Sequence, residues 1–304
     1  SAKAQGKACA SWIGSGGAGH YVKMVHNGIE YGDMQLIAES YHLLRSMGKS
    51  NDDLHSIFTR WNKGELDSYL VEITAQVFAK QESGEQERVI DYILDRAGQK
   101  GPGKWTAISA LELGGPLTLI TESVFARFLS SLKEQRLAAD RLIKGSSIDS
   151  PDISVDDIKD ALYMAKILSY AQGFAVIKKS SAQHVSDIDY GEVASIWRAG
   201  CIIRSAFLDD ITKAFAKDKD LVNLMLDPFF RKELEQRQDS LRKVLQFAVG
   251  RGIPTPSLAA ALSYFDGYRS PWLPANLIQA QRDFFGAHTY RRIDKDKDKV
   301  FHTD

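Results

Sequence analysis

Apolar residues recur three and four positions apart through most of this chain, and this spacing limits the possible folds more than any other feature. From Tyr21 onward the period is that of one face of an α-helix, not the alternation of a strand. Only eight prolines occur, mostly at expected helix boundaries. With 304 residues, 44% of them hydrophobic, the chain can bury one large core or two ordinary ones. The sequence therefore predicts an all-α protein.

The ends of the expected helices follow from capping residues. The longest helix ends before Gly48, and Asn51-Asp52-Asp53 starts the next one. The polar segment Lys144–Ser154 is the best internal boundary. The helices are expected over Gly19–Met47, Leu54–Asn62, Leu66–Lys80, Lys104–Leu113, Leu117–Ile143, Val155–His184, Val193–Lys217 and Pro228–Val249.

A weak internal repeat relates two helical halves at a constant offset of 139 residues. The matching positions are Ile29, Tyr31, Gly32, Leu36 and Ile37 with Leu168, Tyr170, Ala171, Ala175 and Val176, and Ser56-Ile57-Phe58 with Ser195-Ile196-Trp197. This indicates a duplicated helical unit, although amphipathic helices also resemble one another by chance. Only the first copy keeps a polar face, because Lys23, His26, Asn27 and Glu30 correspond to Leu162, Ala165, Lys166 and Ser169. The first long helix is therefore where chemistry is expected.

Charge and cysteine content argue against several classes of protein. Lys plus Arg and Asp plus Glu both number 39, and no long basic segment occurs, so neither nucleic acid nor a membrane surface is an expected partner. Cys9 and Cys201 are the only cysteines, which argues against a disulfide framework and favours a cytoplasmic location. No apolar run reaches the roughly 18 to 20 residues of a membrane span, and the first residues lack a signal-peptide core.

One face of the first long helix carries a mixture of functional side chains. Lys23, His26, Asn27, Glu30 and Tyr31 stand at i, i+3, i+4, i+7 and i+8. Most stripes of this kind are exposed faces or hydrogen-bond clusters, although a purely exposed face would be richer in flexible Glu and Lys. A lysine and a glutamate on one face can divide base and acid work when the lysine loses its proton readily.

Three segments resemble one enzyme family. Residues 17–33, GAGHYVKMVHNGIEYGD, resemble the catalytic helix of 6-phosphogluconate dehydrogenases almost residue for residue. Residues 93–105, ILDRAGQKGPGKW, are similar to the family's signature loop, and residues 275–290, ANLIQAQRDFFGAHTY, to its C-terminal substrate segment. By this resemblance the chain is the helical substrate and dimerisation domain of the family, without its N-terminal NADP-binding domain.

The resemblance implies three parts. Residues 1–16 would be a remnant of the nucleotide domain and its linker, 17–285 the all-helical domain, and 286–304 a C-terminal tail. The helical domain would consist of two pseudo-repeated halves built around the long catalytic helix. Ala8–Ile13 reads as a short strand without partner strands, and Asp294–Lys299 as a solvated charge run, so the chain looks like a piece of a longer protein.

The resemblance also implies a reaction. In the family, 6-phosphogluconate is oxidised by hydride transfer to NADP and then loses carbon dioxide to give ribulose 5-phosphate, a step of the pentose phosphate pathway. Lys23 is implied as the base that takes the C3 hydroxyl proton and then, as an ammonium, polarises the new carbonyl. Glu30 is implied as the acid that protonates C1, a task for a carboxyl that still holds its proton near neutral pH. His26 and Asn27 are implied to position the sugar-acid end.

The phosphate group has its own implied contacts. These are Tyr31, Lys100 and Arg127, with Arg282 adding a planar fork; without the motif, both arginines would be interpreted as ordinary ion pairs. Pro102 stands where the family usually has Thr and provides neither a hydroxyl nor a backbone N–H, so phosphate affinity is reduced or a neighbouring amide compensates. In the family, the segment with Arg282 and His288 enters the other subunit's active site, so a homodimer is expected.

Alternative interpretations remain at this level. The glycine-rich run Gly14–Gly19 could cradle a phosphate, but no βαβ unit surrounds it, and the resemblance makes it the joint between two domains. NADP would then be bound mainly by the absent domain, and the isolated chain would turn over poorly or not at all. The chain could instead be an incomplete helical dimer scaffold, or a domain of a related β-hydroxyacid dehydrogenase, against which the phosphate contacts argue. The histidines show no zinc-ligand spacing, so no metal is expected.

Overall fold

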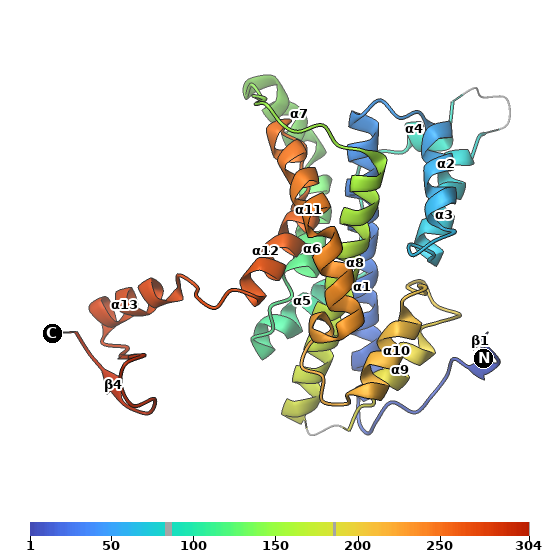
Figure 1. The fold of residues 1–304 in the computed structure, drawn as a ribbon. Coiled ribbons are helices and arrows are strands. Elements are labelled where there is room, and N and C mark those ends of the chain that lie inside the picture. The colour runs from blue at the N-terminus through green and yellow to red at the C-terminus, as the bar shows by residue number, and fades with distance from the viewer. Residues whose placement is uncertain (83–86, 185–186, 304) are drawn as a thin grey trace. The chain divides into compact units, whose positions relative to one another are not determined.

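The computed structural model describes residues 1–82, 87–184 and 187–303, and these residues are mainly helical (Figure 1). The chain divides into two compact units, Ser1–Tyr264 and Phe265–Asp304. The helices are α1 (Ala18–Ser46), α2 (Asn51–Trp61), α3 (Tyr69–Ala79), α4 (Val89–Tyr92), α5 (Pro102–Leu113), α6 (Thr118–Ser131), α7 (Lys133–Leu142), α8 (Val155–His184), α9 (Tyr190–Ile196), α10 (Leu208–Lys217), the 3-10 helix η1 (Leu224–Leu226), α11 (Pro228–Gly250), α12 (Pro256–Tyr268) and α13 (Ala275–Gly286). The prediction of an all-α fold is confirmed.

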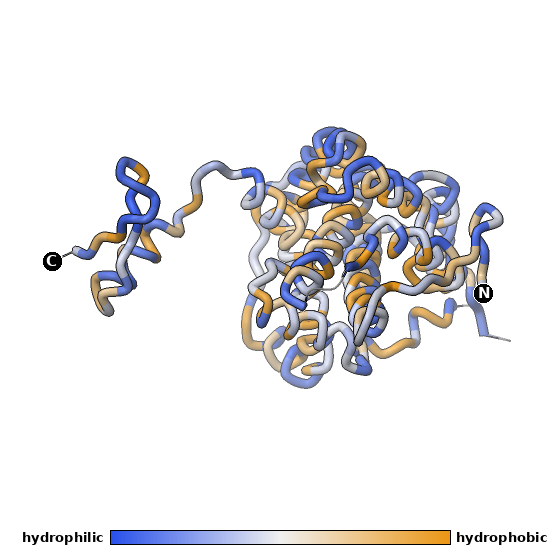
Figure 2. Tube along the Cα trace, turned by 90° about the horizontal axis from the view of Figure 1, so that it is seen from below, coloured by the Kyte–Doolittle hydropathy of each residue, from blue (hydrophilic) through white to orange (hydrophobic). Residues whose placement is uncertain are grey.

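The two longest helices, α1 and α8, lie side by side at the centre of the first unit (Figure 1). They run antiparallel, because Ile29 meets Gly173 while the later residue Asp33 meets the earlier residue Lys166. A Cβ on Gly173 would stand 2.6 Å from a side-chain carbon of Ile29, so glycine is what permits this close packing. Hydrophobic stretches run through the middle of this unit (Figure 2).

The order and spacing of four helices agree with the internal repeat. Helices α2 and α3 begin at Asn51 and Tyr69, and α9 and α10 begin 139 residues later, at Tyr190 and Leu208. The turn before α3 also pairs with the turn before α10. In that pair, the N–H of Tyr69 donates to the Arg204 carbonyl at 3.2 Å. The duplicated units are therefore joined through equivalent turns.

Helix α12 is attached to α1 through a buried carboxylate. The two Glu39 carboxylate oxygens accept backbone N–H bonds from Ser257 and Leu258, each at 2.9 Å. These N–H groups belong to the first turn of α12, where no helical carbonyl can satisfy them. Glu39 is 3% exposed, so this cap lies inside the core.

Two predicted helices are divided in the structure. The helix expected over Leu117–Ile143 breaks at Leu132 into α6 and α7. The helix expected over Val193–Lys217 ends early, and α10 starts after a turn segment that contains Gly200 at φ +74°. Carbonyls in that segment bind distant groups, including the Tyr170 hydroxyl, which donates to Ile203 at 2.7 Å. Tertiary hydrogen bonds therefore override the helical pattern here. Helices α4, α12 and α13 were not predicted.

The strand expected over Ala8–Ile13 was wrong. Strand β1 (Lys3–Ala4) instead pairs antiparallel with β2 (Lys7–Ala8) through a turn at Gln5 and Gly6, both at positive φ. A second antiparallel hairpin, β3 (Tyr290–Arg291) with β4 (Val300–Phe301), lies in the second unit, so the expectation of no further strands was also wrong. Residues 294–299 between these strands are exposed, as predicted for a charge run.

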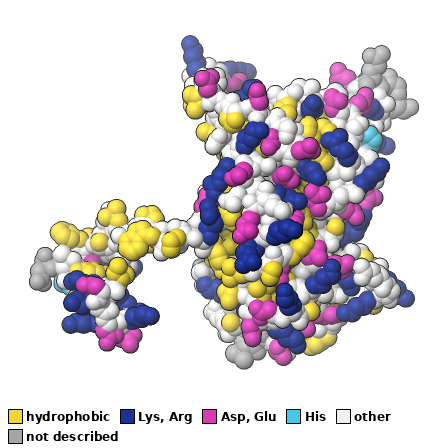
Figure 3. Space-filling model, in the orientation of Figure 1, with side chains coloured by type: hydrophobic (Ala, Val, Ile, Leu, Met, Phe, Trp, Pro, Cys, Tyr) yellow, Lys and Arg dark blue, Asp and Glu magenta, His cyan; other side chains and the backbone are white. Residues whose placement is uncertain are grey.

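The surface agrees with the balanced composition. On the face of residues 1–264 that Figure 3 presents, positive and negative side chains are interspersed. In the described part of the chain, no helix is long and apolar enough to cross a membrane.

Candidate active site

Three side chains on successive turns of α1 form one hydrogen-bonded cluster. The Nζ of Lys23 donates to Asn27 Oδ1 at 2.8 Å and lies 3.1 Å from His26 Nδ1. His26 Nδ1 lies 3.0 Å from the same Asn27 oxygen. The spacing of three and four residues places all three on one face, as the sequence predicts. Lys23 itself is exposed, so a ligand can reach its amine.

His26 is held as a neutral imidazole. Burial, followed by the charge of Lys23, lowers its pKa to about 4, although the bond with Asn27 acts in the opposite direction. The ring stands edge-on to Trp197 with centroids 5.5 Å apart. Its Nε2 is buried without a hydrogen-bond partner among the described residues. A neutral histidine with one free nitrogen can hydrogen-bond to a substrate without adding charge.

Glu30 is half-buried two turns from Lys23. Burial raises the pKa of its carboxyl, the charges of Lys23 and Arg127 lower it, and Asp33 raises it again. The net direction is upward, so this carboxyl keeps its proton at higher pH than a free glutamate. That property suits a general acid.

Tyr31 and Arg127 bring α1 and α6 together. The Arg127 guanidinium carbon lies 3.6 Å from the centroid of the Tyr31 ring, a cation–π arrangement. Arg127 Nη1 also donates to the carbonyl of Gly98 at 3.0 Å, in the loop that precedes α5. Lys100 is exposed in the same loop. Three of the predicted phosphate contacts therefore come from neighbouring parts of the first unit.

Helix α5 packs tightly against this face of α1. A Cβ on Gly103 would overlap the Tyr31 ring, so the ring packs directly against the glycine backbone. The hydroxyl of Thr106 donates to the carbonyls of Met24 at 2.9 Å and Pro102 at 2.8 Å. Pro102 is the first residue of α5, a position that does not require an N–H.

A cavity of about 490 Å³ opens beside the Lys23 cluster. Lys23 and Asn27 line it from α1, and Pro102 and Trp105 line it from α5. The Tyr21 hydroxyl, also from α1, lies 2.9 Å from Ser109 Oγ. Tyr21 and Trp105 also line this cavity, and neither was predicted from the sequence.

Arg282 and His288 belong to the second unit, Phe265–Asp304, which is described by itself. Arg282 Nη1 donates to Gln279 Oε1 at 3.0 Å. Asp283 organises this unit by accepting from His302 at 2.9 Å and from the backbone N–H of Thr303 at 2.8 Å. Burial would raise the pKa of Asp283, but His302 and the backbone bonds outweigh it and hold that pKa at about 2.

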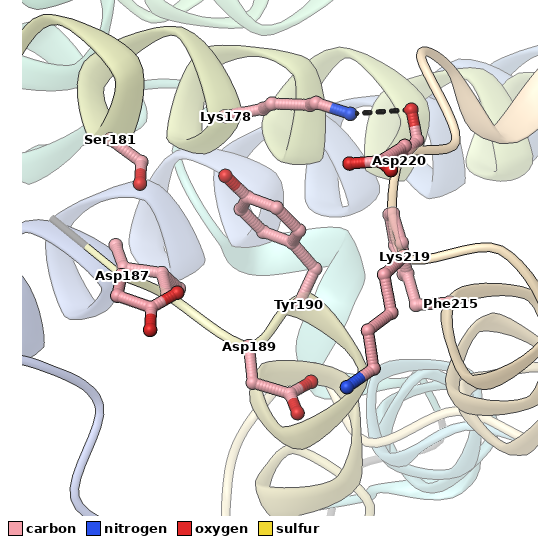
Figure 4. Close-up of a pocket in the computed structure, with 9 residues that line it drawn as sticks. Lys178, Ser181, Asp187, Asp189, Tyr190, Phe215, Lys219 and Asp220 are labelled. Atoms are coloured by element: carbon pink, nitrogen blue, oxygen red, sulfur yellow. Dashed lines mark hydrogen bonds between the residues drawn. The ribbon is translucent and has the colours of Figure 1, made fainter. Parts of the chain in front are cut away.

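A second cavity, of about 540 Å³, lies where the end of α8 meets α9 and α10. None of the predicted site residues lines it. Figure 4 shows Lys178 reaching the backbone of Asp220, and its amine donates to the carbonyls of Asp220 at 2.8 Å and Leu221 at 3.0 Å. This amine is therefore already engaged in joining α8 to the end of α10. Among the described residues, no cluster of three or more His, Cys, Asp or Glu could hold a metal ion.

One known family matches most of this chain. The profile of the 6-phosphogluconate dehydrogenase C-terminal domain matches residues 19–304, which is nearly the whole chain. The chain belongs to this family. The helical unit with the Lys23 face is therefore a 6-phosphogluconate dehydrogenase C-terminal domain.

The curated relatives that the chain matches are longer than the chain itself. The chain is 54% identical over 309 residues to the NADP(+)-dependent, decarboxylating 6-phosphogluconate dehydrogenase of Bacillus subtilis. This match covers 100% of the chain and 66% of that protein. The chain is 53% identical to the decarboxylating enzyme of Escherichia coli K12, covering 98% of the chain and 64% of the relative. The chain thus spans about two thirds of the length of these relatives.

A solved structure of the family has the same fold. Plasmodium falciparum 6-phosphogluconate dehydrogenase, described in its apo form, with its cofactor NADP+ and with its substrate 6-phosphogluconate, matches with a TM-score of 0.95 at 43% identity. The match covers 100% of this chain and 66% of that one. The helical architecture is therefore that of the C-terminal domain of this family.

Proposed function

We propose that this chain supplies the substrate-binding and dimerising part of an NADP-dependent 6-phosphogluconate dehydrogenase. The reaction is the oxidative decarboxylation of 6-phosphogluconate to ribulose 5-phosphate and carbon dioxide. The observation that carries the proposal is the single face of α1 on which the hydrogen-bonded Lys23 cluster, a half-buried Glu30 and the Tyr31–Arg127 stack follow one another. The names of the relatives support the same substrate and coenzyme.

Lys23 acts at the C3 hydroxyl. Lys23 takes the hydroxyl proton while the hydride leaves C3, and NADP, when bound, would accept that hydride. The resulting ammonium then polarises the new carbonyl while the carboxylate group is lost as carbon dioxide. Asn27, 2.8 Å from Nζ, orients the amine, and neutral His26 positions the sugar-acid end.

Glu30 acts on the enediol that remains. Burial raises the pKa of its carboxyl, which favours the protonated form, and this proton goes to C1. Lys23 and Glu30 lie seven residues apart on one helix face, so one extended ligand along that face can reach both side chains. General acid or base groups of this kind typically contribute roughly 10²- to 10⁴-fold in rate.

The phosphate of the substrate is held by Tyr31, Arg127 and Lys100. Arg127 has a planar fork suited to phosphate oxygens, and stacking on Tyr31 limits its motion. Pro102 removes one donor from this set. The backbone N–H groups of Gly103 and Lys104 lie in the first turn of α5, where they lack helical acceptors and favour an anion.

A homodimer completes the site. Arg282 and His288 of the second unit are proposed to serve the neighbouring subunit, as the resemblance implies. Large apolar side chains on α5 and α6, such as Trp105, Leu111 and Phe125, are 53%, 75% and 55% exposed, which supports a covering surface from a second copy. The free thiols Cys9 and Cys201 support a cytoplasmic location.

Activity measurements test the chemistry. The chain is extended by the part of the Bacillus subtilis relative that it does not match, and NADPH and carbon dioxide are measured with 6-phosphogluconate. We expect Lys23→Met to abolish hydride transfer, and Glu30→Gln to impair the step after decarboxylation more than substrate binding. Normal turnover by the Lys23 variant would contradict the assignment. Equal rates with a non-phosphorylated β-hydroxyacid would favour the related dehydrogenases instead.

A further inference from the structure

A buried aromatic ring from α9 contacts the Lys23 cluster, and the reaction described above gives this ring no role. Trp197 is the C-cap residue of α9, and it packs edge-on against His26, with ring centroids 5.5 Å apart and planes at 76°. The two residues are 4% and 1% exposed. His26 places its Nδ1 3.1 Å from the Nζ of Lys23. Trp197 is therefore one contact away from the proposed base.

Trp197 is itself held in place by side chains from other elements. Its ring packs against Phe174 of α8, with centroids 5.4 Å apart, and Phe174 packs against Phe215 of α10 at 5.3 Å. The Trp197 carbonyl accepts from the Cys201 thiol at 3.1 Å. Because all three rings are buried, turning Trp197 would open a void in a close-packed core. The ring that meets His26 thus has a fixed orientation.

Hydrogen bonds alone do not hold the His26 ring. Its Nδ1 lies 3.1 Å from Lys23 Nζ and 3.0 Å from Asn27 Oδ1. The opposite nitrogen, Nε2, is buried without a partner among the described residues. A shift of the ring by about 1 Å would take Nδ1 out of hydrogen-bond range. Packing must therefore fix the rest of the ring, and Trp197 provides a direct ring contact.

The internal repeat shows what is particular to Trp197. Its counterpart 139 residues earlier is Phe58 on α2, which packs against Trp61 of the same helix at 4.9 Å and Phe78 of α3 at 5.6 Å. These partners are aromatic core residues, whereas the partner of Trp197 on α1 is a polar residue of the Lys23 cluster. The same repeat position therefore serves the core in one half and contacts the candidate site in the other.

We propose that Trp197 is a positioning residue for the reaction: its ring fixes the His26 imidazole with Nδ1 toward Lys23 and Asn27, and it keeps water away from the imidazole. The inference rests on the proposed roles of His26 and Lys23. The charge that acts on His26 is that of Lys23, on the same helix. From the segment after α9, the titratable group nearby is the Cys201 thiol, which is bonded to the Trp197 carbonyl.

The titration of His26 in the ligand-free chain tests this inference. Signals of ¹³C-labelled histidine rings are followed by NMR, with a His26→Gln spectrum used for assignment. Trp197→Leu shortens the side chain and lets water approach the imidazole. We therefore expect the His26 pKa to rise from about 4 towards 6.5, by roughly one unit or more. Trp197→Phe keeps an aromatic ring and should show a smaller rise.

A matched control replaces another buried tryptophan. Trp61 is 1% exposed and packs against Phe58, so Trp61→Leu removes the same side-chain volume from the core. It should leave the His26 pKa unchanged. A folded Trp197→Leu variant whose His26 pKa equals that of the unmodified chain would overturn the proposal. An equal rise in the Trp61 variant would also overturn it, because any loss of core packing would then be sufficient.

Measurements on the unmodified chain keep the proposal testable even where neither Trp197 variant folds. We expect a nuclear Overhauser effect between the rings of Trp197 and His26. Its absence, or a His26 titration midpoint near the unfolded value, would overturn the proposal. These readouts need no substrate, so failure to bind 6-phosphogluconate would count against the proposed function and not against this contact.

A binding measurement extends the test to the ligand. Where the unmodified chain binds 6-phosphogluconate, Trp197→Leu should raise the Kd about tenfold, as expected when one well-oriented hydrogen bond from His26 is lost. Trp61→Leu should leave the Kd unchanged. A Kd that is the same in the Trp197→Leu variant and the unmodified chain would overturn the positioning role.

Discussion

The guanidinium carbon of Arg127 lies 3.6 Å from the centroid of the Tyr31 ring, so two predicted phosphate contacts stack on each other. One residue comes from α1 and the other from α6. Holding the guanidinium in place beforehand reduces the entropy lost on binding. The stack therefore links helix packing to ligand affinity.

Two substitutions of Tyr31 should weaken the binding of 6-phosphogluconate to different extents. Tyr31→Phe keeps the stack and removes only the hydroxyl, whereas Tyr31→Ala removes both. Because an interaction of this kind contributes about 1 to 2 kcal/mol when desolvated, we expect Tyr31→Ala to raise the Kd for 6-phosphogluconate about tenfold more than Tyr31→Phe does. Calorimetry on both variants checks this. Equal effects would mean that the stack does not contribute.

Gly103 is predicted to be intolerant of a methyl group. A Cβ there would overlap the Tyr31 ring, so Gly103→Ala should destabilise the fold by about 1 to 3 kcal/mol through overpacking. The control is Gly267→Ala, also in a helix, where no atom lies within 4 Å. Urea unfolding of both variants measures the difference. A Gly103 variant as stable as the control would show that α5 is free to move away from α1.

Glu39 should make stability depend on pH. Burial raises its pKa to about 7, against the N–H bonds from α12, whereas an unfolded glutamate has a pKa near 4.5. The folded state therefore binds the proton more tightly, and stability falls as pH rises from about 4.5 to about 7, by up to about 3 kcal/mol. Glu39→Gln cannot ionise, so it should lack this component. If the free energies of unfolding of the two proteins changed in parallel across that pH range, the prediction would be wrong.

His26 should remain neutral through the working pH range. With a pKa of about 4 in the fold against 6.5 when unfolded, its contribution to stability is present above pH 6.5 and is lost as pH falls towards 4. We expect its ring signal, assigned by comparison with His26→Gln, to stay constant from roughly pH 5.5 to roughly pH 8, the range in which an ordinary histidine titrates. A midpoint near the unfolded value would show that the ring is not desolvated.

The polar face of α1 was predictable because helical spacing alone places Lys23, His26 and Asn27 together. The breaks at Leu132 and in the segment before α10 were not, because bonds such as Tyr170 to the Ile203 carbonyl depend on the assembled fold. The position of Lys166 could be noticed in the sequence, because a charged residue stands there among the apolar residues of an expected helix. Its partner Asp33 lies 133 residues away, and no local pattern connects them.

The role of Arg127 came from family resemblance rather than from spacing. Its stack on Tyr31 joins two helices whose approach the sequence pattern does not specify. The roles of Arg282 and His288 stay predictions, because they concern a neighbouring subunit. Residue type and helical spacing thus identify the predicted catalytic face of α1. Tertiary packing decides which residues from other helices contact that face.

Calorimetric titration of the 304-residue chain with 6-phosphogluconate and, separately, with gluconate tests the central claim most directly. Low salt favours detection of charge-dependent binding, and the protein concentration is known. We predict saturable binding of the phosphate ester and at least tenfold weaker binding of gluconate, an order-of-magnitude figure for the loss of charge-assisted bonds. Equal affinity for both would contradict a phosphate site at Tyr31 and Arg127, and binding of neither would favour the incomplete helical scaffold.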